Sequence, residues 1–242
     1  MVSRRVTTTG GQTGEVDAFL EQLAATPSPA IVSPGSAARR LVFGLDATLS
    51  RQPTWDLACT LQAAMFEEAA ALGGLEVQLV YYRGPSECRA SRWTPEASRL
   101  AALMAKVGCQ GGPTQIGRMI RHVEAEAAQS PVSAFVFVGD AMEEGIDAVC
   151  TAAGRLAVRG VPAFMFQEGS DPAVTAAYRE VARLTGGAWS RFDAGAAGEL
   201  RSLLRAAAAY AAGGTAALTR LAGQPGGGAA AGRLLQSMRG GQ

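Results

Sequence analysis

The sequence predicts an α/β fold, a doubly wound, Rossmann-like and mostly parallel sheet with helices on both faces. Between residues 39 and 212, short apolar segments alternate with longer segments of helical periodicity. One of these segments, Ala134-Phe135-Val136-Phe137-Val138, is apolar throughout. Strands that are apolar on both faces are typical of parallel sheets covered by helices, and the crossovers between such strands are right-handed.

The first half of this region gives three strands and three helices in order. A strand at about 40–46 precedes a helix at about 53–72, which begins at Pro53 and ends before Gly73-Gly74. The segment 75–82 alternates polar and apolar residues and then becomes apolar, which favours a second strand. A short polar strand at 87–93 and helices at 95–107 and 115–129 follow; in the last, Ile116, Ile120 and Val123 share one side.

The second half continues the alternation. After the apolar strand at 134–138, the pattern predicts a helix at 145–159 and a strand at 161–167. A helix at 172–185, a strand at 188–192 and a helix at 196–211 complete the series. We therefore expect one domain over residues 39–212.

Two flanks of different composition surround this domain. Residues 1–38 are polar and rich in Gly, Pro and Ser, and we expect a flexible segment with a short amphipathic helix at 16–23. Residues 213–242 are rich in Gly and Ala and carry basic but no acidic residues. We expect them to form a flexible, solvated tail.

The composition excludes several functional classes. A net charge of +1 argues against a general nucleic-acid binder. The four cysteines form no C-x-x-C pair and His122 is the only histidine, which argues against a zinc site. The N-terminus lacks the apolar core of a signal peptide, and no apolar stretch is long enough to span a membrane. We expect a cytoplasmic protein with free thiols.

Oxygen-bearing side chains follow the first expected strand directly. In Asp46-Ala47-Thr48-Leu49-Ser50 a carboxylate and two hydroxyls alternate along the chain where a buried strand should open into a loop. Thr114 stands in the loop before the helix at 115–129, and Asp140 follows the strand at 134–138. In doubly wound sheets ligands bind beyond the carboxyl ends of the strands, so these three segments can meet at one point. Their oxygens are the hard ligands that Mg²⁺ prefers.

The set Asp46, Thr48, Ser50, Thr114 and Asp140 resembles the metal-ion-dependent adhesion site of von Willebrand factor type A domains. The resemblance covers about residues 40–212 and implies a six-stranded sheet of order 3-2-1-4-5-6, with the polar strand at 87–93 as an antiparallel edge. Thr48 replaces the usual first serine, and Pro113 stands where the family often has glycine. Both changes keep the oxygens of the motif.

The resemblance implies a binding mechanism rather than catalysis. Thr48, Ser50 and Thr114 would contact Mg²⁺, with Mn²⁺ as the alternative, through their hydroxyls, while Asp46 and Asp140 would act largely through bound waters. An acidic side chain of a protein partner would take the open coordination position. Family members inside bacterial cells often belong to multiprotein complexes, some with AAA+ ATPases or chaperones. We expect the partner to touch a rim of residues at the same sheet end: Arg51, Gln52, Arg83, Gln115, Met142 and Glu143.

Two other classes of function remain open. Asp46 could be the nucleophile of a haloacid-dehalogenase-like, Mg²⁺-dependent phosphatase, but that family needs a second carboxylate two residues later, where Thr48 stands. Alternatively the domain is a scaffold whose basic C-terminal stretch docks on an acidic protein, or weakly on a membrane or nucleic acid. Phosphate release from p-nitrophenyl phosphate and deletion of residues 213–242 would distinguish these alternatives.

Overall fold

The computed structural model describes residues 39–52, 75–193, 196–224 and 228–240. The chain divides into two units, Met1–Ser36 and Ala37–Gln242, and the description below concerns the second. The helices expected at 16–23 and 53–72 lie outside the described residues.

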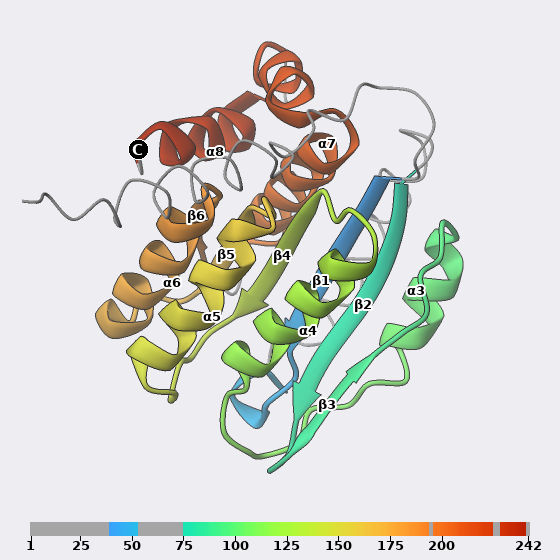
Figure 1. The fold of residues 1–242 in the computed structure, drawn as a ribbon, viewed down its shortest axis with the longest axis vertical. Helices are drawn as coiled ribbons and strands as arrows, with labels where there is room; N and C mark the ends of the chain where they lie inside the picture. Colours follow the sequence, from blue (N-terminus) through green and yellow to red (C-terminus); the bar gives the residue numbers. More distant parts are fainter. Residues whose placement is uncertain (1–38, 53–74, 194–195, 225–227, 241–242) are drawn as a thin grey trace, which may run out of the picture. The chain divides into compact units, whose positions relative to one another are not determined.

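A six-stranded sheet of order β3-β2-β1-β4-β5-β6 forms the centre of this unit (Figure 1). β3 pairs antiparallel with β2, and all other neighbours are parallel. The fold class and strand order expected from the sequence are therefore confirmed. The strands are β1 (Arg39–Asp46), β2 (Leu75–Arg83), β3 (Glu87–Ala90), β4 (Ala134–Gly139), β5 (Ala163–Glu168) and β6 (Ala188–Phe192).

Each face of the sheet contributes side chains to its own apolar cluster. Successive side chains of a strand point to opposite faces, so Val42 joins one cluster while Leu41 and Phe43 join the other. The first face packs on α4 (Ile116–Gln129), α5 (Ile146–Val158) and α6 (Pro172–Thr185). The second packs on α3 (Ala97–Met104), α7 (Ala197–Ala222) and α8 (Gly228–Gly240). In Figure 1 α4, α5 and α6 lie in front of the sheet and α7 behind it.

Local sequence signals fix the helix ends. At the start of α6 the Asp171 carboxylate accepts hydrogen bonds from the backbone N–H groups of Ala173 and Val174, and Pro172 occupies the first turn. Both features are typical of helix N-termini. The helix ends at Gly186, whose φ of +68° is the left-handed conformation that glycine adopts at low cost.

The C-terminal stretch differs from the solvated tail that the sequence suggested. α7 continues past residue 212 across a kink at Gly213-Gly214, and α8 follows it. Leu218, Leu234 and Leu235 join the apolar cluster on the second face. The many glycines of this stretch mask an apolar helical pattern, and burial of its leucines makes it part of the domain core.

The sheet topology brings the carboxyl ends of β1 and β4 together. Leu45 of β1 lies beside Val138 of β4, so Asp46 and Asp140 emerge from neighbouring strands at the same edge. The order of the strands reverses between β1 and β4, which is where doubly wound sheets bind ligands. Within the part of the chain described, no helix has the length and apolar character needed to cross a bilayer.

Two valines of α5 test the assignment of its buried face. Val149 is fully buried against the sheet, whereas Val158 on the same helix is 86% exposed. We expect Val149→Ala to lower the free energy of unfolding by about 2 kcal/mol, since it removes buried methyl groups and leaves a cavity. Val158→Ala should change it by less than about 0.5 kcal/mol. Urea unfolding followed by circular dichroism measures both, and equal losses would contradict the assigned face.

Candidate metal centre

Three loops are joined by backbone hydrogen bonds at the carboxyl edge of the sheet. The Ala47 N–H after β1 donates to the Tyr82 carbonyl at 3.0 Å, and the Gln110 N–H donates to the Ala47 carbonyl at 3.0 Å. The Gly84 N–H after β2 donates to the Gln110 carbonyl at 3.3 Å. The loop that carries Thr114 is thereby fixed between the loop after β1 and the turn after β2.

Gly112 lets this loop approach the turn after β2. A Cβ atom at position 112 would lie 2.0 Å from the carbonyl oxygen of Gly84, a distance that no side chain can accept. Gly84 itself has a φ of +60°. Close backbone contact therefore requires a glycine at position 112, whereas a Cβ at Gly111 would meet only the Leu49 side chain, at 3.1 Å.

Asp46 is fully buried at the end of β1. Its Oδ1 accepts a hydrogen bond from the Thr48 N–H at 2.8 Å, and its Oδ2 accepts one from the Tyr82 hydroxyl at 2.8 Å. Burial raises the pKa of the Asp46 carboxyl, hydrogen bonds from Thr48 and Tyr82 oppose the rise, and the negative charge of Asp140 adds to it. The carboxylate is thus held in place but disfavoured in its charged form.

The hydroxyls that follow Asp46 contact one another. Thr48 Oγ1 and Ser50 Oγ lie 3.0 Å apart within hydrogen-bond distance. Thr48 is buried and Ser50 is exposed. The two hydroxyl oxygens that were predicted to bind a cation therefore lie side by side.

Asp140 supplies an unsatisfied oxygen at the same edge. Its Oδ1 is buried and finds no hydrogen-bond partner among the described residues. Burial of an unpaired carboxylate oxygen costs free energy, and such atoms are rare in folded proteins. The side chain of Tyr178 lies near both acids. Burial raises the pKa of its phenol most, and the negative charges of Asp46 and Asp140 each raise it further.

Two glutamates join the loop after β4 to the Thr114 loop. The Glu143 N–H donates to Thr114 Oγ1 at 2.9 Å, and the Thr114 N–H donates to Glu143 Oε2 at 3.1 Å. The Glu144 carboxylate accepts hydrogen bonds from the N–H groups of Ile116 and Gly117 at the start of α4. Negative charge is favourable at a helix N-terminus. Thr114 and Asp140 are thus drawn to the same region, although their loops lie far apart in sequence.

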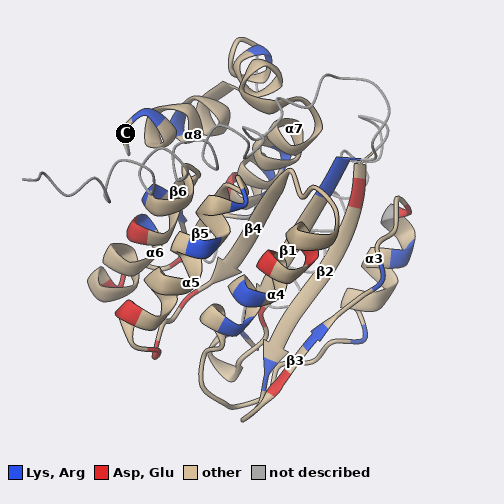
Figure 2. Cartoon of the chain, in the orientation of Figure 1, with Lys and Arg blue, Asp and Glu red and all other residues tan. Residues whose placement is uncertain are grey.

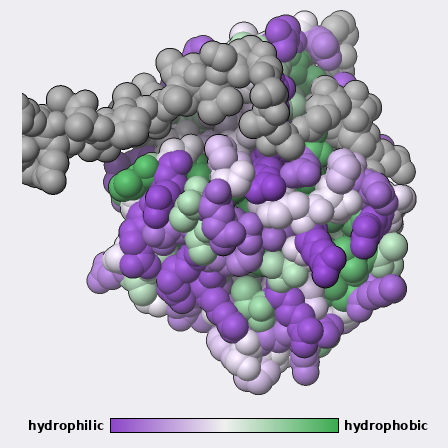
Figure 3. All heavy atoms as spheres, turned by 45° about the vertical axis from the view of Figure 1, so that its right-hand side comes forward, coloured by the Kyte–Doolittle hydropathy of each residue, from purple (hydrophilic) through white to green (hydrophobic). Residues whose placement is uncertain are grey.

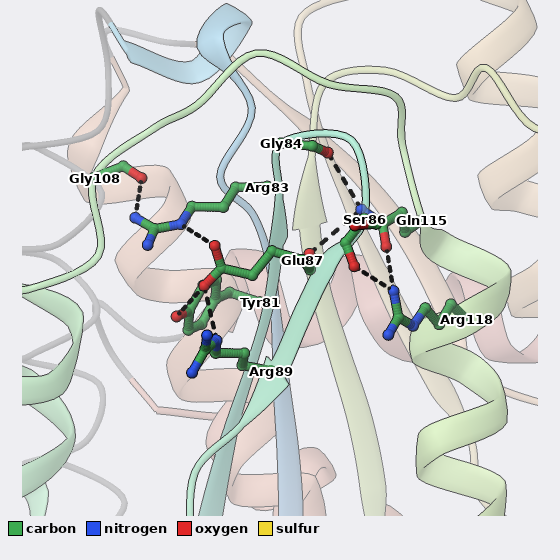
Figure 4. Close-up of polar contacts among 9 residues, drawn as sticks. All are labelled: Tyr81, Arg83, Gly84, Ser86, Glu87, Arg89, Gly108, Gln115 and Arg118. Atoms are coloured by element: carbon green, nitrogen blue, oxygen red, sulfur yellow. Dashed lines mark hydrogen bonds and ion pairs between the residues drawn. The ribbon is translucent and has the colours of Figure 1, made fainter.

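Gln115 anchors the Thr114 loop from the other side (Figure 4). Its Nε2 donates to the carbonyls of Gly84 at 3.4 Å and Glu87 at 3.3 Å, and its Oε1 accepts from Arg118 at 3.0 Å. Arg83 donates to Glu87 Oε2 at 2.9 Å and to the Gly108 carbonyl at 2.9 Å. Both residues were expected at an exposed rim, but their side chains connect the β2–β3 turn to neighbouring segments.

Arg51 also departs from the expected rim position. Its side chain is 1% exposed and forms a buried ion pair with Glu168 at the end of β5. A buried arginine beside a carboxylate cannot serve as an exposed partner contact, so the rim expectation does not hold for Arg51. Of the other rim residues, Gln52 and Glu143 are exposed and Met142 is partly buried.

Two apolar side chains that were not among the predicted site residues are exposed in the site loops. Leu49, between the two hydroxyl residues, is 57% exposed, and Ile146 at the start of α5 is 41% exposed. The alternation in Asp46-Ala47-Thr48-Leu49-Ser50 could have pointed to Leu49, because it separates the two clustered hydroxyls. On the face shown in Figure 3, hydrophilic residues predominate and hydrophobic ones form small separate areas.

No protein-family model and no curated protein matches this chain by sequence. Solved structures match it by fold. A von Willebrand factor type A protein from Catenulispora acidiphila has a TM-score of 0.58 at 15% identity, covering 72% of this chain and 43% of its own. The SpRpn10 VWA domain has a TM-score of 0.55 at 10% identity, covering 66% and 90% respectively. The PilB minor pilin from Streptococcus sanguinis has a TM-score of 0.55 at 10% identity, covering 72% and 61%.

This chain has a von Willebrand factor A-like fold. The likeness extends over about two thirds or more of the chain, and the chain spans less than half of the Catenulispora acidiphila protein. Identities of 10–15% relate the folds and leave the function of this chain to its own residues.

The residues of this A-like domain fit a small hard cation. Two carboxylates and three hydroxyls stand on loops at one edge, and one carboxylate oxygen is buried without a partner. Oxygen donors of this kind suit Mg²⁺, which also keeps several waters. Across the described ranges, no group of three or more His, Cys, Asp or Glu side chains could hold a metal. The candidate centre has only two carboxylates, so it depends on the hydroxyls.

Two glycines of the Thr114 loop test its close packing. Gly112→Ala should lower the free energy of unfolding by roughly 1–3 kcal/mol, because the new methyl group meets the Gly84 backbone. Gly108→Ala is the matched control, since a Cβ there meets nothing within 4 Å. Thermal unfolding of both variants measures the effect. A Gly112→Ala protein as stable as the control would refute the proposed packing.

Proposed function

We propose that this domain binds a protein partner through a divalent cation held at the carboxyl edge of its sheet. Thr48, Ser50 and Thr114 would offer hydroxyl oxygens, and Asp46 and Asp140 would offer carboxylates, largely through water. Mg²⁺ is the expected ion and Mn²⁺ its alternative. When bound, the cation would supply an open coordination position for an acidic side chain of the partner.

The observation that carries this proposal is uncompensated negative charge. Asp140 Oδ1 is buried without a hydrogen-bond partner among the described residues, and burial and Asp140 both raise the pKa of Asp46. The nearby cation Arg51 is already offset by the carboxylate of Glu168. The charge of Asp46 and Asp140 therefore remains unbalanced within the site, and a divalent cation would balance it.

The hydroxyl contacts support the same set of ligands. Thr48 and Ser50 share one hydrogen bond, and Thr114 Oγ1 accepts only the Glu143 N–H among the bonds found. A hydroxyl oxygen has two acceptor sites, so each can still face a cation. Because hydroxyl ligands are neutral, they would leave the cation electron-poor and receptive to a partner's carboxylate.

The geometry disfavours the phosphatase alternative. A nucleophilic aspartate must reach its substrate, but Asp46 is 0% exposed and each of its oxygens accepts a hydrogen bond. Position 48, where that chemistry needs an acid/base carboxylate, is a threonine. Both observations favour binding over hydrolysis at this edge.

The partner and its setting belong to the same proposal. We place the partner in a cytoplasmic multiprotein complex, with an AAA+ ATPase or a chaperone as the class suggested by the family resemblance. Its contact surface would include Gln52 and Glu143, which are exposed at this edge, and the apolar side chain of Leu49.

Metal binding can be measured without knowing the partner. We expect saturating Mg²⁺ or Mn²⁺ to raise the free energy of unfolding by roughly 3 kcal/mol at one hundred times the dissociation constant. Asp46→Asn and Asp140→Asn should abolish the rise, whereas Asp147→Asn, an exposed aspartate on α5, should keep it. Calorimetric titration and thermal unfolding with and without EDTA provide the measurement.

An unchanged thermal midpoint in saturating Mn²⁺ would refute the metal site. Partner binding that persists in EDTA and in Asp46→Ala would refute the proposal that the cation bridges the domain to its partner.

The effect of the cation should depend on pH. The pKa of Asp46 is raised in the folded state, so the folded protein holds that proton more tightly than the unfolded chain. Between the unfolded pKa of about 3.9 and the raised folded pKa, stability without metal therefore falls as pH rises. A cation binds the charged form, so Mg²⁺ should raise the thermal midpoint more at about pH 7.5 than at about pH 4.5. An equal rise at both pH values would contradict a role for the Asp46 carboxylate.

A further inference from the structure

A groove of about 730 Å³ lies between α6, β6 and α8, away from the candidate metal centre. α6 starts beyond the carboxyl end of β5 and runs back toward its amino end, where Gly187 lies against the backbone of Ala163. The groove is lined by the second half of α6, by residues 189–191 of β6 and by the second half of α8. Its lining follows the edge strand β6 and includes no residue of the candidate metal centre.

Arginines dominate the charge of the groove. Among the described residues, four arginines line it, and Glu199 is the only acidic residue of the lining. Arg183 pairs with Glu180 at 2.6 Å and Arg233 pairs with Glu199 at 2.8 Å. Arg179 and Arg191 are both exposed, and neither meets a carboxylate within the described ranges. Figure 2 shows the basic positions on α6 and α8 near β6.

One of the two available arginines is held in a fixed orientation. The Arg179 guanidinium lies over the Trp189 ring, 4.2 Å from its centroid. The ring is itself positioned, because its Nε1–H donates to Gln167 Oε1 at 3.2 Å. A guanidinium stacked on an aromatic ring keeps its N–H groups directed outward, so it can bind a carboxylate with less loss of conformational entropy.

α8 closes the exposed edge of the sheet at this groove. The Trp189 backbone N–H faces away from β5 and donates to Ser237 Oγ at 3.1 Å. A helix that covers an edge strand prevents another strand from pairing with it. A ligand of the groove must therefore be recognised by side chains rather than by strand addition.

We propose that this groove binds an acidic peptide segment of a protein partner, with carboxylates on Arg179 and Arg191. A planar guanidinium matches a carboxylate with two parallel hydrogen bonds. The two arginines come from different elements, α6 and β6, which suits two acidic side chains of one segment. This binding needs no cation and is independent of the proposed metal bridge.

Other anions fit the groove less well. α6 and α8 both border it with their C-terminal halves, whose partial negative charge opposes a compact dianion such as phosphate more strongly than a singly charged carboxylate. Single-stranded nucleic acid needs an aromatic face on which a base can stack. Arg179 already covers the Trp189 ring. Of these anionic ligands, a peptide with singly charged carboxylates fits the groove best.

The test uses fluorescence anisotropy of a fluorescein-labelled Gly-Glu repeat peptide on the full chain in EDTA. A peptide of about twelve residues spans about 40 Å when extended, enough to cross the groove. We expect Arg179→Glu and Arg191→Glu each to weaken binding roughly tenfold or more, as expected for lost charge-assisted hydrogen bonds. Arg179→Lys, which keeps the charge but not the planar fork, should weaken binding by a smaller factor.

Arg92→Glu is the matched control, since Arg92 is an exposed arginine next to the opposite edge of the sheet. Circular dichroism confirms that the variants fold, and Asp140→Asn should bind the peptide as the wild type does. Failure of the wild type to bind in EDTA would overturn this proposal and leave the metal site untouched. An equal loss in Arg92→Glu, or displacement of the peptide by inorganic phosphate or oligo-dT at lower concentration than unlabelled peptide, would overturn it as well.

Discussion

The arrangement of the site depends on one electrostatic constraint, the placement of two carboxylates at neighbouring strand ends inside a folded edge. Parallel pairing of β1 and β4 forces Asp46 and Asp140 to leave the sheet together. Burial disfavours the charged form of Asp46 and raises its pKa, and the negative charge of Asp140 adds to the rise. Apolar residues would pack at this edge without that cost, which supports the proposal that the carboxylates serve binding.

Contacts between the surrounding loops fix the positions of those loops. Glu143 and Glu144 join the loop after β4 to Thr114 and to the start of α4. Gln115 joins the same loop to the β2–β3 turn, and Arg51 joins the hydroxyl loop to the end of β5. Because these contacts are made within the protein itself, they hold the loops that carry the proposed ligand oxygens without any ligand. Such preorganisation lowers the cost of binding a cation.

The sequence pattern predicted the strands, and the positions of Asp46 and Asp140 at strand ends, because both follow local rules. The apolar segment at 134–138 is β4 at Ala134–Gly139, and each acidic residue of the site directly follows or ends a strand. It missed the roles of Arg51 and Gln115, because their partners Glu168 and Gly84 are distant in sequence and neighbours only in the fold. It also placed the domain end too early, since the glycines near 213 and 223–228 suggested a flexible tail. The leucines on α7 and α8 indicated instead that this stretch packs on the domain core.

The two proposed sites would offer acidic ligands opposite kinds of surface. In the proposed metal site the protein itself contributes negative charge, so an acidic side chain of a partner would bind only after a cation had reversed the sign of the local charge. At the α6–α8 groove the arginines provide positive charge directly. An acidic partner long enough to reach both proposed sites would bind with two independent contacts, and linking them would raise its affinity through effective concentration. Removal of the divalent cation would then weaken the complex without dissolving it, because the groove contact does not use the metal.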